Sequence, residues 1–201
     1  MGWTSWSRKA AEPPRGSDSW VGLDLNSSRL RMMTGDGQRI ARPVILDEPH
    51  EEFPLAAAFP GRNPEWGHAA LAVERRWPHL FLADFLHDVN LPRRWEIGRH
   101  RYTSAELLGQ VFQRLRPLCP RTTTLTAVLP AYLTSQKVTI LAEIMDRCRL
   151  PIRGSALLPL ALAATHDLPD RRPATILVID ADDHAMTASL VSAEEQQVRL
   201  L

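Results

Sequence analysis

The pattern of apolar and polar residues predicts a run of short strands at the start of the chain. Residues 20–25, Trp-Val-Gly-Leu-Asp-Leu, are an apolar stretch that contains one acid and runs into small polar residues. Leu30 and Met32 then alternate with polar residues, and Gly35-Asp36-Gly37 is typical of a tight turn. Residues 41–49 form a third extended stretch. We therefore predict a three-stranded antiparallel meander over residues 20–49.

Beyond Thr103 the spacing of apolar residues changes, and it predicts helices that alternate with strands. Thr103 and Glu106 have the spacing of a capping box, and Thr134 precedes a second apolar stripe as an N-cap. The inward faces of these two helices consist of Leu107, Leu108, Val111, Phe112 and Leu115, and of Val138, Leu141, Ile144, Met145 and Cys148. Further strands are expected at 124–130, 151–158 and 174–180, a third helix at 159–166, and a closing hairpin at 186–192 and 198–201 around a turn at 194–197.

Two segments lack this regularity. Residues 1–19 mix Trp, Arg, Pro, Gly and Ser without an apolar core, so we expect a disordered tail that is not a secretion signal. Residues 50–100 contain only one short helical piece, near 67–76, and are predicted to be an insertion on the sheet. The predicted organisation is therefore a tail at 1–19, a lobe at 20–172, and the incomplete start of a second lobe at 173–201.

Composition narrows the classes of function. The net charge of +1 argues against nucleic acid and against a membrane as the partner. Cys119 and Cys148 match no zinc or redox spacing, so we interpret them as core thiols of a cytoplasmic protein. The absence of an apolar run of about 18 residues predicts that nothing spans a bilayer.

The predicted order of elements indicates the fold class. Three antiparallel strands followed by helix, strand, helix, strand and helix are typical of an α/β ribonuclease-H-like lobe, here with a mixed sheet and the first hairpin of a second lobe. In such a lobe the carboxylates that end the first strands meet at one edge of the sheet, where they can hold a divalent ion beside phosphates. Asp24 and Asp180 occupy the two strand ends.

Several motifs together resemble the nucleotide-binding domain of the seventy-kilodalton heat-shock chaperones (DnaK type), within the actin-like ATPase superfamily. VGLDLNSS at 21–28 resembles the first phosphate loop of that family, and ILVIDADDHAMTASLV at 176–191 resembles the second. The longest similar stretch is TAVLPAYLTSQKVTILAEIMDRCRLPI at 126–152. Shorter similarities are EWGHAALA at 65–72, LADFLHDVN at 82–90, RYTSAELLGQVFQRLR at 101–116 and LPLALAAT at 158–165.

The resemblance implies ATP or ADP with Mg²⁺ bound between two lobes. Asp24 and Asp180 match the carboxylates that the family places near magnesium, and Pro130 matches a proline that relays between lobes. Asn26 replaces a glycine that takes up left-handed backbone, which Asn tolerates. The remaining residues expected to contact nucleotide are Ser27 and Ser28 in the first loop and Asp182 and Asp183 in the second.

The departures from the family pattern predict weak binding and defective hydrolysis. Leu71 stands where the family has its catalytic lysine, Leu158 replaces a glutamate, and Thr187 replaces a second carboxylate. Asp182, Asp183 and His184 replace three glycines and place negative charge where a triphosphate would approach. The segment that grips adenosine in the family is also absent from this sequence. Loss of one charge-stabilising group commonly lowers a rate by about 100- to 1000-fold.

Other interpretations use the same residues. Asp180-Ala-Asp182 also fits the opening motif of haloacid-dehalogenase phosphotransferases, a magnesium site at 180–184, or a solvated acidic turn. A ribonuclease-H-type nuclease would use Asp24, but Glu106 is already explained as a cap. The alternative to a nucleotide-binding chaperone-like lobe is a non-catalytic interaction scaffold, or half of a split ATPase, with a protein partner or a second copy on the exposed lobe face.

Overall fold

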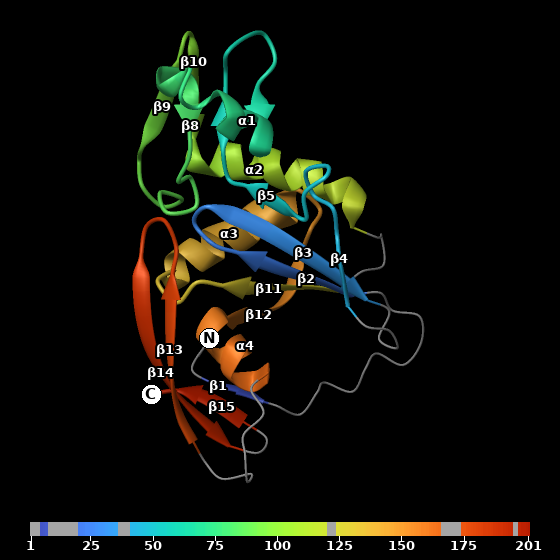
Figure 1. Ribbon diagram of the computed structural model, residues 1–201, viewed down its shortest axis with the longest axis vertical. Coiled ribbons are helices and arrows are strands. Elements are labelled where there is room, and N and C mark those ends of the chain that lie inside the picture. The colour runs from blue at the N-terminus through green and yellow to red at the C-terminus, as the bar shows by residue number, and fades with distance from the viewer. Residues whose placement is uncertain (1–4, 8–19, 36–40, 120–123, 166–173, 195–196) are drawn as a thin grey trace.

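The computed structural model describes residues 5–7, 20–35, 41–119, 124–165, 174–194 and 197–201. Its central element is a mixed sheet with the order β12-β11-β2-β3-β4, in which β5 also pairs with β3 (Figure 1). The strands are β2 (Trp20–Leu25), β3 (Arg29–Gly35), β4 (Arg42–Pro43), β5 (Glu52–Pro54), β11 (Thr124–Leu129) and β12 (Ile152–Leu157). β11 runs parallel to β2 and β12, whereas β3 is antiparallel to its neighbours. The predicted mixed α/β class is confirmed.

One face of this sheet forms the main core. Along β2, Val21, Leu23 and Leu25 are buried while the residues between them are half-buried, the alternation expected of a strand with one face against the core. These side chains join one cluster with the buried faces of α2 (Ser104–Leu115) and α3 (Ser135–Arg147). The predicted core positions of both helices are buried, except Val138, which is half-buried.

Both helices begin at the predicted caps. The Thr103 N–H donates to Glu106 Oε2 at 2.8 Å, and the Glu106 N–H donates to Thr103 Oγ1 at 3.2 Å, which completes the capping box of α2. Thr134 Oγ1 accepts a longer bond, 3.4 Å, from the Lys137 N–H at the start of α3. In the first turn of each helix, a side chain therefore accepts a hydrogen bond from a backbone N–H group that has no partner within the helix.

The prediction of one continuous third strand over 41–49 is wrong. β4 ends at Pro43, and a second short strand, β5, takes up the pairing with β3 from residue 52. Between them the chain turns at Asp47 and His50, whose backbone groups bond each other, and Pro43 has no N–H for a ladder. The Asp47 carboxylate accepts the His68 N–H at 2.7 Å, so it belongs to the start of α1 (His68–Val73).

The predicted insertion contains more structure than one helical piece. Besides α1 it has η1 (Pro78–Leu80), a three-stranded sheet and a hairpin, which lie at the top of Figure 1. The strands are β6 (Ala57–Ala58), β7 (Glu65–Trp66), β8 (Phe81–Leu82), β9 (Arg94–Ile97) and β10 (His100–Thr103). The small sheet packs on buried alanines, Ala56, Ala58 and Ala70. Strands of two residues packed on alanine leave almost no hydrophobic period in the sequence.

A second sheet of four strands has the order β1-β15-β14-β13. β13 (Ala174–Ala181), β14 (Met186–Glu194) and β15 (Gln197–Leu200) form the predicted hairpin region, and one face packs on α4 (Leu158–Thr165). β1 (Ser5–Ser7) pairs with β15, which offers an open edge. β1 lies within residues 1–19, for which the sequence predicts a disordered tail. The rest of the 1–19 tail, and the predicted turn at Asp36-Gly37, lie outside the described residues.

Two minor predictions concern the core and the membrane. Cys119 and Cys148 are free and buried, as predicted. In the described ranges no helix has the length and apolar character needed to cross a bilayer.

Candidate functional site

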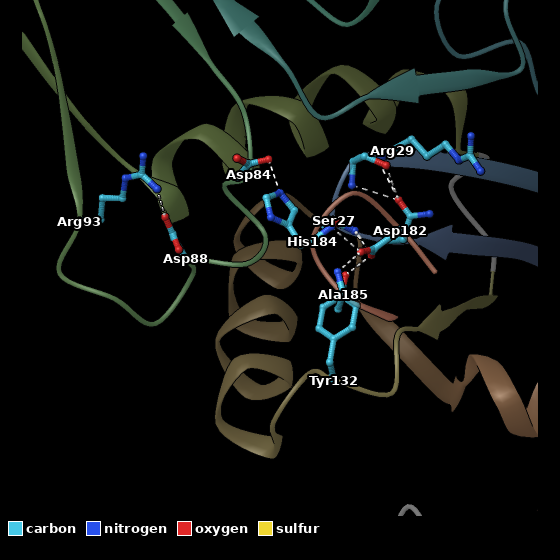
Figure 2. Close-up of polar contacts among 11 residues, drawn as sticks. Ser27, Arg29, Asp84, Asp88, Arg93, Tyr132, Asp182, His184 and Ala185 are labelled. Atoms are coloured by element: carbon cyan, nitrogen blue, oxygen red, sulfur yellow. Dashed lines mark hydrogen bonds and ion pairs between the residues drawn. The ribbon is translucent and has the colours of Figure 1, made fainter. Parts of the chain in front are cut away.

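The two segments that resemble phosphate loops meet at the junction of the two sheets (Figure 2). The first is residues 26–28, between β2 and β3, and the second is the turn 182–185, between β13 and β14. They are joined by the Asp182 carboxylate, whose Oδ2 accepts the Ser27 N–H at 3.3 Å. These residues are 155 positions apart in the chain, so tertiary structure alone brings them together.

Asn26 shapes the first loop through its side chain. Its Oδ1 accepts the backbone N–H of Ser28 at 3.1 Å and that of Arg29 at 2.9 Å. Asn26 is not among the described non-glycine residues with positive φ, which are Asp84 and Arg149. An Asx-type turn holds the loop, so Asn26 does not make use of the left-handed backbone that it tolerates.

Asp182 is the most heavily bonded acid in the site. Its Oδ1 accepts the N–H groups of His184 at 3.0 Å and Ala185 at 2.9 Å, and its Oδ2 accepts the Tyr132 hydroxyl at 2.5 Å. Burial alone would raise the pKa of this carboxyl, but the bonds from Tyr132, the His184 amide, Ser27 and the Ala185 amide outweigh it and lower the pKa to about 2. Burial and the bond to Asp182 raise the pKa of the Tyr132 phenol. Asp182 is thus half-buried and bonded, whereas Asp183 and His184 in the same turn are exposed.

Asp24 and Asp180 lie at the same junction with a different electrostatic balance. Burial raises the pKa of Asp24, Arg31 and Arg29 oppose this rise, and Asp180 adds to it. Burial and the charge of Asp182 raise the pKa of Asp180. The charge of Asp180 is the smallest of the four effects on the pKa of Asp24. Thr187, the replacement for a second carboxylate, pairs directly opposite Asp180 on β14.

A histidine and an acid extend the site toward the insertion. His184 Nε2 contacts Asp84 Oδ1 (Figure 2). The His184 ring also stacks on His87, with centroids 5.5 Å apart. Asp84 has a φ of 67°, which is uncommon for a non-glycine residue. The insertion therefore contacts the β13–β14 turn directly.

A pocket of about 530 Å³ lies beside these contacts. Leu71 lines it together with Ser28, Asp183 and His184, so the position compared with the catalytic lysine faces the same space as both loops. Its ionisable lining comprises four acids, one histidine and one arginine: Glu52, Glu74, Asp84, Asp183, His184 and Arg29. An acidic lining repels a triphosphate unless a cation is also bound.

The acids at this junction suit a magnesium ion only in part. In the described part of the chain no group of three or more His, Cys, Asp or Glu side chains is arranged to hold a metal. Mg²⁺ is commonly held by one or two carboxylates, with water and phosphate oxygens completing the octahedron. Asp24 and Asp180 supply two carboxylates at the strand ends, whereas the carboxylate of Asp182 already accepts four hydrogen bonds.

The structure thus assembles all seven predicted site residues around one junction but gives them different roles. Asp24 and Asp180 form an acid pair, Asn26 and Ser27 build the first loop, Ser28 and Asp183 line the pocket, and Asp182 bonds both loops. Sequence reasoning missed Tyr132 and Asp84. Tyr132 stands in the Pro-Ala-Tyr part of the longest similar stretch, and Asp84 stands in the shorter similar stretch at 82–90, so the resemblance held a usable signal for both.

The chain has no match among known protein families, and no curated protein is significantly similar to it.

Proposed function

We propose that this chain is a chaperone-like nucleotide-binding lobe of the actin-like ATPase type, built on a ribonuclease-H-like sheet, with defective hydrolysis. The meeting of loop 26–28 and turn 182–185 beside the acids Asp24 and Asp180 carries the proposal. The strand order β12-β11-β2-β3 with β4 and β5, parallel on one side of β2 and antiparallel on the other, supports it. ATP or ADP with Mg²⁺ is the proposed ligand.

The pocket supports weak binding and absent turnover. Leu71 gives it a side chain that can neither neutralise a phosphate nor orient water, and it has an excess of acids over basic groups. Asp24 and Asp180 would hold the magnesium ion, which would neutralise phosphate charge when bound. The basic groups among the described residues of the pocket are His184, which contacts Asp84, and Arg29, whose guanidinium contacts Glu52 at 3.6 Å.

Titration calorimetry with ATP and with ADP, each with Mg²⁺, tests this function. We expect weak heats of binding for the wild-type chain, no release of phosphate above background, and loss of the heats in Asp24→Asn. Asp146→Asn changes an exposed acid near the end of α3 and is the matched control, which should bind as the wild type does. Absence of heat and of a thermal shift at millimolar nucleotide would refute nucleotide binding. Turnover that Asp24→Asn abolishes would refute the defect in hydrolysis.

A non-catalytic interaction scaffold, or half of a split ATPase, is the second candidate. It is favoured by the outer face of the β13–β14 hairpin, where Leu177, Ile179, Met186 and Leu190 are exposed. Because apolar patches of this kind mark contacts with other proteins, we propose a protein partner or a second copy there. The double variant Leu177→Asp, Ile179→Asp should abolish any concentration-dependent increase in mass in sedimentation. An unchanged mass distribution would contradict a second copy as the partner.

A further inference from the structure

The contacts of Asp182 have the form of a bound anion. Its carboxylate accepts four hydrogen bonds, from the Ser27 N–H, the Tyr132 hydroxyl, the His184 N–H and the Ala185 N–H, at distances from 2.5 to 3.3 Å. The donors come from three separate parts of the chain: the β2–β3 loop, the segment after β11 and the β13–β14 turn. Figure 2 shows these groups converging on one carboxylate.

Such a set of donors is what proteins use to hold phosphate or carboxylate groups. Backbone N–H groups of turns form anion-binding concavities, and a hydroxyl adds a charge-assisted bond. Ser27 is fully buried, and its Oγ has no partner with good hydrogen-bond geometry, although it lies near enough to help lower the pKa of Asp182. This hydroxyl is a further polar atom beside the carboxylate, available to a second acceptor oxygen.

No arginine of the described chain bonds this carboxylate. Arg31 donates to Glu52 at 2.8 Å and Arg29 lies 3.6 Å from the same acid, so both guanidinium groups are turned to β5. The donors around Asp182 are therefore neutral N–H and O–H groups, and the single negative charge of its carboxylate is enough to satisfy them. A free phosphate would have to compete with an acid that is covalently attached and already in place, which gives the attached acid a large advantage in effective concentration.

We propose that Asp182 is a built-in anion that occupies the phosphate-binding groups of both loops, so that this subsite is closed in the wild-type chain and opens when the Asp182 carboxylate is removed. Where it concerns nucleotide, this proposal rests on the proposed function, because the subsite would then be the one that holds the phosphate groups of the nucleotide. The same bonds fasten the β13–β14 hairpin to loop 26–28, so closing the subsite also joins the two sheets.

Removal of the carboxylate provides the test. Asp182→Ala leaves the donors and creates space for an anion, while Asp146→Ala removes an exposed acid near the end of α3 and is the matched control. The probes are inorganic phosphate and acetate, titrated at constant ionic strength against chloride, with the unfolding temperature and calorimetry as readouts. Phosphate stabilises many proteins without binding a site, and the wild type and Asp146→Ala measure that background.

We expect Asp182→Ala to unfold at a lower temperature than the wild type and to regain stability as phosphate or acetate is added. Its affinity for phosphate should exceed that of both the wild type and Asp146→Ala by at least about tenfold, a change of about 1.4 kcal/mol. Equal affinities in all three proteins would overturn the proposal, and so would a folded Asp182→Ala protein that no anion stabilises.

A second measurement covers the case in which Asp182→Ala does not fold. Asp182→Ser removes the carboxylate but keeps an oxygen that can accept an N–H group of the turn, and its affinity for phosphate should also exceed that of the wild type. An affinity for phosphate equal to that of the wild type would overturn the proposal.

The two proposals fail separately. If Asp182→Ala binds phosphate more tightly than the wild type does, but neither of these two proteins binds ATP, the built-in anion is supported and the nucleotide-binding function is refuted. If the wild type binds ATP and Asp182→Ala binds it no better, the function stands and the built-in anion falls.

Discussion

The two sheets of this protein share a construction but differ on their outer faces. Each has one face in a core, with β2 and β3 packed on α2 and α3, and β13, β14 and β15 packed on α4. On the outer face of the first sheet β3 carries Arg29 and Arg31, which pair with Glu52. On the outer face of the second sheet Leu177 and Ile179 are 58% and 64% exposed, and Leu177 is paired across the ladder with exposed Leu190.

This difference separates a face suited to water from a face suited to a partner. An antiparallel pair that meets solvent on one side normally alternates apolar and polar residues, as β3 does. β13 instead carries mostly apolar residues on both of its faces, which is the pattern of a strand that is covered on both sides. Strand β13 also forms the edge of its sheet, so its backbone groups are available for pairing as well.

Truncation of one leucine on each face gives the largest expected contrast. Leu23→Ala empties a position on β2 that is buried against the helices, and should cost about 2 to 5 kcal/mol of unfolding free energy. Leu177→Ala, on the exposed face of β13, should change it by less than about 0.5 kcal/mol. Urea unfolding of both variants measures the difference. Similar costs at the two sites would mean that the outer face of β13 is covered in solution.

Removal of the α2 cap tests how firmly the first sheet is covered. Thr103→Ala abolishes the capping box, and we expect a loss of about 1 kcal/mol because the Glu106 N–H loses its acceptor. The control is Thr139→Ala on α3, whose hydroxyl bonds only the Ser135 carbonyl. An unchanged unfolding free energy in Thr103→Ala would show that tertiary packing alone holds this end of α2.

The acids at the junction of the sheets should respond to pH with opposite signs. Asp182 has a pKa lowered to about 2 from 3.8, so its contribution to stability is present above about pH 4 and is lost as the pH falls toward 2. The pKa of Asp24 is raised, so its contribution is present below 3.8 and is lost as the pH rises through its raised pKa.

Unfolding temperatures of Asp182→Asn and Asp24→Asn, measured against the wild type from pH 2 to 7, check these signs. We expect the Asp182→Asn protein to be less stable near neutrality and to approach the wild type at pH 2. The Asp24→Asn protein should gain stability as the pH rises. The same direction for both variants would contradict the assignment of the two acids.

The ion pair on the polar outer face should have the smallest effect. Arg31 and Glu52 are both partly exposed, and exposed pairs contribute about 0 to 1 kcal/mol because water and salt screen them. Glu52→Gln should therefore lower stability by less than about 1 kcal/mol, and less in high salt. A larger, salt-independent loss would mean that this face is packed rather than solvated.

Local rules account for what the sequence alone determined. Thr103 and Thr134 mark the starts of α2 and α3, alternation at Val21, Leu23 and Leu25 marks β2, and strand-end position selects Asp24 and Asp180. Each of these signals lies within a few residues, where propensity, capping and period act. The short strands β6 to β8 escaped prediction because two residues are too few to show a period.

Only the tertiary structure decided the role of Asp182. From the sequence this residue is one of three side chains that replace glycines in a turn, and it reads as a charge that repels phosphate. In the fold, loop 26–28, Tyr132 and the β13–β14 turn converge on it from positions up to 155 residues apart. The donors of a hydrogen bond cannot be inferred from spacing when the segments that carry them are brought together by the packing of two sheets. The sequence thus determined where the acids lie along the strands, whereas the fold determined that one of them serves as the anion of its own site.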